Sequence, residues 1–328
     1  MLFVHARRRS RFVILLALLS ACVLFTLGSV AAPSNTTLSL FRMASESPTP
    51  IPTSGESVRV TSIAGLLTAL DDNAMTDIVV ADGTYRVSPS NSQASNSLWI
   101  GARFADRTNP VTVRAETRGG VTFDGGGAIY FGGITFVAGV HHQTWDGFVW
   151  ANGAPTNSAG DGGTGVMVFG GYAGQAAPHH ITIRNSTVRP IATATQRGHA
   201  VYLSYAVGGA HDLTFDNFTI DDPGGRGAQA GFHFYHSDAA NQNAWNVTVR
   251  NSRITGTQQG FMVWDPTIHD VLVEDTTISG ATRIAVRYDE GSRITLRRVT
   301  STGSGERGFF SDKGSKPPEV TFIDSVLR

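Results

Sequence analysis

The chain has 328 residues, and its 26 Lys and Arg balance 26 Asp and Glu, so the formal net charge is zero. This balance argues against a nucleic-acid-binding protein, because such proteins present a basic surface, and charged residues make up only 16% of the chain. Hydrophobic residues reach 41%, which excludes a disordered chain, and 37 glycines favour many short strands joined by tight turns.

Residues 1–32 have the pattern of a secretory signal peptide. A basic stretch at residues 5–11 precedes an apolar run at residues 12–27, and Ala31 ends a cleavage pattern of small residues. Two alternatives stay open: Cys22 follows a sequence that matches a bacterial lipobox, or the uncleaved apolar run anchors the chain in a membrane. In each case we expect the folded part to be secreted or to lie at the outer face of the membrane.

Residues 33–57 are rich in Ser, Thr and Pro and are predicted to be a linker, which leaves residues 58–328 for a single folded domain. The aliphatic residues of 62–74 fall on one face of a helix that Thr61 or Ser62 can cap. Repeat proteins need their open ends covered, so we expect this short N-terminal helix to cap the hydrophobic core of the folded domain.

A phrase of five residues, alternating apolar and polar, recurs through the rest of the chain. Its copies begin at Ile181, Leu213, Val247, Val271, Ile294 and Val320, after a degenerate copy at Gln143. The alternation is typical of a half-buried strand, with the first and third residues inside and the second, mostly Thr, outside. The repeat therefore predicts an all-β parallel β-helix, a solenoid with one phrase per coil.

The last two columns of the phrase support the same stacking. The sign of the fourth residue alternates from coil to coil through Arg184, Asp216, Arg250, Glu274 and Arg297. Strands in a sheet lie about 4.8 Å apart, so each charge would have two opposite neighbours. The fifth residue is mostly Asn or Asp, which tolerate the left-handed backbone conformation of a sharp corner.

The segments that come after the predicted helix, at residues 78–85, 110–115 and 120–125, resemble the opening coils of pectate-lyase-like right-handed β-helix proteins, particularly the alginate-lyase and chondroitinase-B types. The resemblance implies a single-stranded right-handed helix, and a secreted protein that acts on acidic polysaccharide as a lyase, hydrolase or epimerase, or that only binds it. The catalytic motifs of polygalacturonases, alginate epimerases and pectate lyases are absent, so no catalytic residue carries over.

A second strand precedes each phrase, and its outward positions mix aromatic and charged side chains. For β-elimination, His233 and Tyr235 are the candidate base and acid. Arg287 or Lys313 is the candidate cation that neutralises the substrate carboxylate. The candidate substrate-binding residues are Trp264, His236, Asp265, Tyr288 and Asp289. A hydrolase would need two facing carboxylates instead, for which Asp265 and Asp289 are the candidates.

Structural roles compete with these functional ones. Arg287 can simply pair with one of the two carboxylates, and His199 and Tyr202, the latter in a column predicted to face inward, are interpreted as structural. The histidines that precede the phrases, at 141–142, 179–180, 211 and 269, favour a turn role over a metal site. No cofactor is expected beyond Ca²⁺, for which residues 221–222 are a minor candidate.

The hypothesis we favour is an extracytoplasmic polysaccharide lyase that cleaves a uronic-acid-containing polysaccharide by β-elimination. The alternatives are a non-catalytic carbohydrate-binding surface protein and a glycoside hydrolase on the same scaffold, because a fold does not fix a function. The expected partner is an acidic polysaccharide and not a nucleic acid. Contact with a membrane is expected only through the N-terminal segment.

Overall fold

In the computed structural model, the described residues are 55–87, 98–126, 133–153, 165–170, 176–190, 198–203, 209–222, 228–235, 244–314 and 317–328. The predicted signal segment, most of the predicted linker and His236 lie outside these ranges. The residues from Pro52 to Arg328 belong to one compact unit. In the part of the chain that the structure describes, no helix is long and apolar enough to cross a membrane.

The predicted N-terminal helix is present as α1 (Ile63–Asp71), and the side chain of Ser62 caps it by accepting a hydrogen bond from the backbone of Gly65 at 3.0 Å. It ends three residues earlier than predicted. At the end of the helix, the buried guanidinium of Arg107 donates hydrogen bonds to the carbonyl oxygens of Leu70 and Asp72, each at 2.7 Å. The last carbonyl groups of a helix have no hydrogen-bond donor within the helix, so Arg107 supplies one. The aliphatic face of α1 packs into the first part of the hydrophobic core.

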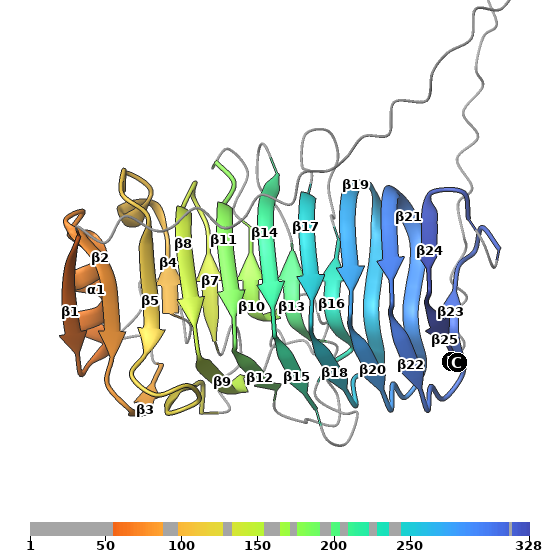
Figure 1. Ribbon diagram of the computed structural model, residues 1–328, viewed down its shortest axis with the longest axis horizontal. Helices are drawn as coiled ribbons and strands as arrows, with labels where there is room; N and C mark the ends of the chain where they lie inside the picture. The colour runs from red at the N-terminus through yellow and green to blue at the C-terminus, as the bar shows by residue number, and fades with distance from the viewer. Residues whose placement is uncertain are drawn as a thin grey trace, which may run out of the picture. The chain divides into compact units, whose positions relative to one another are not determined.

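Parallel strands pair into two sheets, one of 16 strands and one of nine, and the larger one is made of two parts joined through β19 and β21, so that three faces result. The repeated phrases form the first face, here called the phrase sheet. Its strands are β1 (Glu56–Val60), β2 (Met75–Val80), β5 (Val111–Ala115), β8 (His141–Asp146), β11 (His179–Arg184), β14 (Ala210–Asp216), β17 (Ala244–Arg250), the second halves of β19 (Gln259–Glu274) and β21 (Ile284–Arg297), and β24 (Val320–Ile323). Figure 1 shows these strands side by side in chain order, beginning at the end that carries α1.

The strands that precede the phrases form the second face, here called the site sheet. They are β4 (Leu98–Ile100), β7 (Ile134–Phe136), β10 (Gly165–Phe169), β13 (His199–Leu203), β16 (Ala230–Phe234), the first halves of β19 and β21, and β23 (Arg307–Phe310). Because β19 and β21 run through both, they join the phrase sheet to the site sheet.

The third face is the nine-stranded sheet, which closes each coil. It consists of β3 (Gly83–Arg86), β6 (Val121–Asp124), β9 (Phe148–Gly153), β12 (Thr187–Pro190), β15 (Thr219–Asp221), β18 (Arg253–Thr255), β20 (Thr277–Ser279), β22 (Thr300–Thr302) and β25 (Val326–Leu327). A short turn of 3₁₀ helix, η1 (Ala102–Phe104), comes after β4. The predicted all-β, right-handed parallel β-helix with an N-terminal capping helix is confirmed.

The register of the phrase sheet is the one that the aligned phrases predict. The first residues of the six phrases pair in order, and those of the first five are at most 3% exposed. The charged column also forms as predicted: Arg184 bonds to Asp146 at 2.8 Å, and Arg250 to Asp216 at 2.9 Å. The corner residue is left-handed in every phrase, with φ of 53° at Asn185.

Candidate functional site

The candidate site lies on the outer face of the site sheet, where one column of side chains crosses successive coils. Register places in this column Thr135, Val168, Tyr202, His233, Met262, Arg287 and Phe310. The prediction that Tyr202 faces inward is wrong, because its neighbour Val201 belongs to the hydrophobic core and Tyr202 does not. All five residues of β10 and of β13 are buried, so the sequence of these strands does not alternate between apolar and polar residues and does not indicate which side chains face inward.

His233 is outward-facing, yet it is only 5% exposed and forms a pair with a second buried histidine. Its Nδ1 lies 2.8 Å from Nε2 of His199, one coil earlier, and one of the two nitrogens carries the shared proton. Burial lowers the pKa of His199 to about 3. Burial, with the nearby charges of His199 and Arg287, also holds the pKa of His233 well below its usual value. Both imidazoles are therefore neutral near pH 7.

Aromatic rings cover this histidine pair. The ring centroids of Tyr202 and Tyr235 each lie 5.3 Å from that of His233, and the centroid of Trp264 lies at 6.4 Å. Trp264 is 43% exposed, a high value for so large an apolar side chain. An exposed indole beside a tyrosine is a surface on which a sugar ring can stack.

Arg287 brings a positive charge to the same surface. Its guanidinium carbon lies 4.9 Å from the centroid of Trp264, and its Nε donates to Asp289 Oδ2 at 2.7 Å. Asp289 is only 6% exposed, and its Oδ1 has no hydrogen-bond partner in the described structure. Burial raises the pKa of this carboxyl group, while Arg287 opposes the rise. The carboxyl group is thus held mainly by the arginine.

Two predicted site residues lie elsewhere. Tyr288 was expected to bind substrate, but it pairs with Val263 in the interior, is 1% exposed, and donates its hydroxyl proton to the carbonyl of Gly291 at 2.6 Å. Lys313 comes after the strand that lies three coils beyond His233, and its Nζ lies 3.9 Å from Glu319. The structure corrects both expectations, because neither side chain joins the surface around His233.

The carboxylate pair expected for a hydrolase engages separate partners. Asp265 accepts hydrogen bonds from the backbone and hydroxyl of Thr267, at 2.8 and 2.5 Å, whereas Asp289 is bonded to Arg287. Both carboxylates are buried. His236, the remaining candidate, lies outside the described residues.

The turn role expected of the histidines that precede the phrases is seen at two of them, His142 and His180. The backbone is left-handed at His142 and His180, with φ of 53° at each, as it is at Asp212 in the same column. Their neighbours stack from coil to coil, with 4.9 Å between the ring centroids of His179 and His211. Burial and the surrounding imidazoles lower the pKa of His179 to about 4. Asp212 continues this column and was not predicted from the sequence, although Asp212 and His180 each stand directly before a phrase.

Comparison with protein-family models gives no match, and no curated protein matches the chain. Among solved structures, it is similar to an alginate lyase from Paenibacillus sp. str. FPU-7, at 15% identity and a TM-score of 0.44, covering 83% of this chain and 99% of that one.

A pectate lyase II from Xanthomonas campestris pv. campestris str. ATCC 33913 is similar at 10% identity and a TM-score of 0.37, covering 82% of this chain and 80% of that one. The PL6 family alginate lyase AlyGC is similar at 13% identity and a TM-score of 0.40, over 78% of this chain. This chain spans 40% of that enzyme's length. The parallel β-helix fold is shown by the pairing of this chain's own strands from coil to coil.

Proposed function

We propose that this protein binds an acidic polysaccharide across the outer face of the site sheet and cleaves it by β-elimination at His233. One observation carries the proposal: a neutral imidazole, an exposed indole and a guanidinium meet on three successive coils of one face. The charge of Arg287 reaches His233, since it contributes to the lowered pKa of that histidine. These are the groups that a uronate requires of a lyase: a base, a stacking surface and a cation.

Each step has a candidate group on this face. Arg287 would neutralise the uronate carboxylate, which makes the proton on the adjacent carbon more acidic. His233 Nε2 would remove that proton, provided that Nδ1 carries the hydrogen donated to His199. The electron pair left on carbon then forms the C4–C5 double bond as the bond from C4 to the glycosidic oxygen breaks. The hydroxyl of Tyr235 would protonate the departing oxygen.

A second candidate function, binding without cleavage, is favoured by two features of the same surface. His233 exposes only 5% of its surface, and Arg287 is already paired with Asp289, so a substrate would have to displace that carboxylate. Trp264 is 43% exposed, so it is accessible to a sugar without exposure of His233 and without displacement of Asp289 from Arg287. The distinction between the two functions therefore rests on His233 and not on Trp264.

The test is ultraviolet absorbance over time, with the full chain mixed with pectate, alginate or chondroitin sulfate, with and without calcium. A lyase gives rising absorbance from unsaturated uronide ends. We expect His233→Gln to abolish this rise while polymer binding persists, and Arg287→Ala to weaken both. Arg253→Ala is the matched control, because Arg253 is exposed on the third face and its Nε donates within its own strand, to Thr255.

Electrophoresis through gels that contain each polymer separates the remaining outcomes. A flat absorbance trace, with retardation of the wild type that Trp264→Ala abolishes, would establish the binding protein and refute the lyase. A flat trace without retardation on any of the three polymers would refute both.

A further inference from the structure

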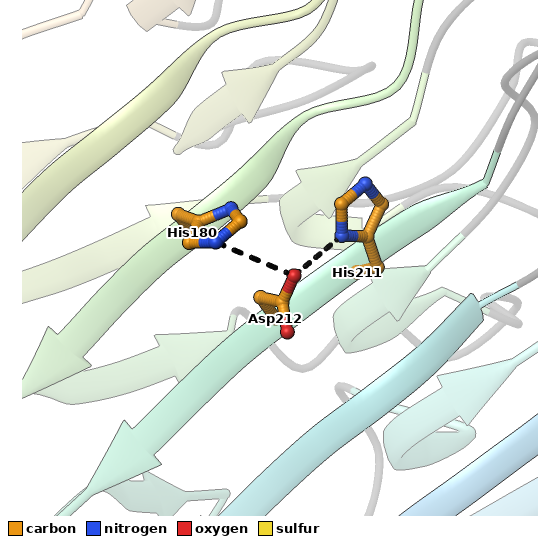
Figure 2. A group of neighbouring side chains, drawn as sticks. All are labelled: His180, His211 and Asp212. Carbon is orange, nitrogen blue, oxygen red and sulfur yellow. Dashed lines mark hydrogen bonds and ion pairs between the residues drawn. The ribbon is translucent and has the colours of Figure 1, made fainter.

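Three side chains from two successive coils of the phrase sheet converge on one point at its edge. Asp212 Oδ2 lies 2.7 Å from His211 Nδ1 and 3.6 Å from His180 Nε2. Figure 2 shows both imidazoles directed at this carboxylate, from β11 and β14. One ligand atom from each residue falls within 4.8 Å of the other two.

These separations are near those of a coordination sphere. Zinc binds imidazole nitrogen at about 2.0–2.1 Å and carboxylate oxygen at about 2.0–2.2 Å, so two ligands of a tetrahedral ion lie about 3.4 Å apart. The separation between His180 and Asp212 already has this size. The shorter separation between His211 and Asp212 is a hydrogen bond, and it opens when the imidazole takes its other tautomer and frees the Nδ1 lone pair.

Each of the three side chains is also oriented by a further neighbour, through a hydrogen bond or ring stacking. His180 Nδ1 lies 2.8 Å from His179 Nδ1, so a hydrogen donated to His179 leaves the Nε2 lone pair of His180 facing Asp212. The ring of His211 is stacked between those of His179 and Trp245, at 4.9 and 4.2 Å. The other oxygen of Asp212 accepts a hydrogen bond from the amide of Asn246. Support of this kind orients ligands in known metal sites.

Two coils further on, the chain contains a second arrangement of this kind, here called the closed arrangement because an arginine side chain is bonded to its aspartate. His269 Nδ1 lies 2.7 Å from Asp270 Oδ2, as in the pair at 211 and 212. There the next coil supplies Arg293, whose guanidinium contacts both oxygens of Asp270 at 2.5 and 2.7 Å. At Asp212 the adjacent coils supply a histidine and an asparagine, neither of which brings a fixed positive charge.

We propose that His180, His211 and Asp212 bind one divalent transition-metal ion of the zinc class, with a fourth position open to solvent. The three side chains are 47%, 22% and 29% exposed, so an ion can reach them. Two nitrogens and one oxygen suit zinc and disfavour calcium, which takes six to eight oxygen ligands. The ion would join β11 to β14 across one coil, independently of the surface around His233.

Zinc binding to the full chain, without a histidine tag and stripped of metal by a chelator, tests the proposal by isothermal titration calorimetry. We expect one zinc ion per chain, not displaced by excess calcium. His180→Asn and Asp212→Asn should each weaken binding at least tenfold. Asparagine also tolerates the left-handed backbone, and Asn246 occupies this column naturally, so both variants are expected to fold.

Two further variants separate coordination from general damage. Asn246→Gly removes the hydrogen bond to Asp212 and keeps a residue that tolerates the left-handed backbone at this position, where φ is 53°, and it should weaken zinc binding about 10- to 100-fold. His269→Ala, the matched control, removes the histidine of the closed arrangement and should leave zinc affinity unchanged. The proposal is overturned if the wild type binds no zinc, or if the bound zinc is unaffected by both His180→Asn and Asp212→Asn while circular dichroism shows all variants folded.

Discussion

Acidification should destabilise this protein through the buried pair of His199 and His233, and replacing one member should measurably reduce the effect. Both pKa values are depressed in the folded state, that of His199 to about 3. In the unfolded chain each imidazole titrates near 6.5. At a pH between the folded-state and unfolded-state pKa values, the imidazoles are protonated in the unfolded state and neutral in the folded state. The free energy of unfolding therefore falls as the pH falls through about 6.5.

The magnitude comes from the size of the shift. At pH 5 the solution lies about 1.5 units below the unfolded pKa, and each unit is worth about 1.36 kcal/mol. His199, whose pKa in the folded state is about 3, therefore costs the folded state about 2 kcal/mol at pH 5 and almost nothing at pH 7, and His233 acts in the same direction. A change of this size is a large part of the total stability of an ordinary domain.

The assay is urea unfolding of the wild type and of His199→Gln at pH 7, 6 and 5, monitored by tryptophan fluorescence. Titrating groups away from His199 are common to the two proteins, so they cancel in the difference. His233, whose pKa His199 helps to lower, should contribute less to the pH dependence in the variant, which adds to the difference in the same direction. We expect the wild type to lose about 2 kcal/mol more than the variant between pH 7 and pH 5. A difference between the two proteins that stays constant with pH would refute the argument, because it would show that His199 titrates alike in both states.

Two predictions concern the scaffold. Asn217→Ala should lower the free energy of unfolding by about 1–2 kcal/mol more than Asn217→Gly, because φ is 51° at this corner and both variants lose the hydrogen bond that Asn217 Nδ2 donates to Asn185 Oδ1; urea midpoints compare the two. Phe232→Ala should cost about 3–5 kcal/mol by the same measurement, because its fully buried ring stacks on Phe261 at 5.1 Å and its loss leaves a cavity. A loss below about 1 kcal/mol would mean that the coil collapses around the missing ring.

The phrase sheet could be predicted from the sequence because its outer face meets solvent. In β11 and β14, Thr182 and Thr214 are partly exposed between buried neighbours, so polar and apolar residues alternate and the phrases align. Alignment then fixes the charged column and the left-handed corner, since residues at the same position in each phrase pair across the sheet.

The first part of the site sheet could not be predicted as well, because both faces of β10, β13 and β16 are buried. In β13 and β16 every residue is buried, Tyr202 and His233 included, so hydrophobicity no longer distinguishes inside from outside. The strands aligned for the predicted inner column were consequently offset, and Tyr288 was placed at the surface. Asp212 could not be predicted for a different reason: its column has the sequence pattern of a turn, and the register between coils decides which side chains such a turn brings together.

The two histidine clusters show how one residue type serves different chemistry on one scaffold. His233 lies under aromatic rings and beside Arg287, so its proton affinity falls and its lone pair is available only to a substrate that enters the face. His180 lies half in solvent beside a carboxylate whose neighbours on the adjacent coils are a histidine and an asparagine, a setting that favours a cation over a sugar acid. A ligand for one cluster should therefore leave the other unchanged. The coil register decides this division, because it determines whether each histidine has an aromatic ring, an arginine or an aspartate as its neighbour one coil away.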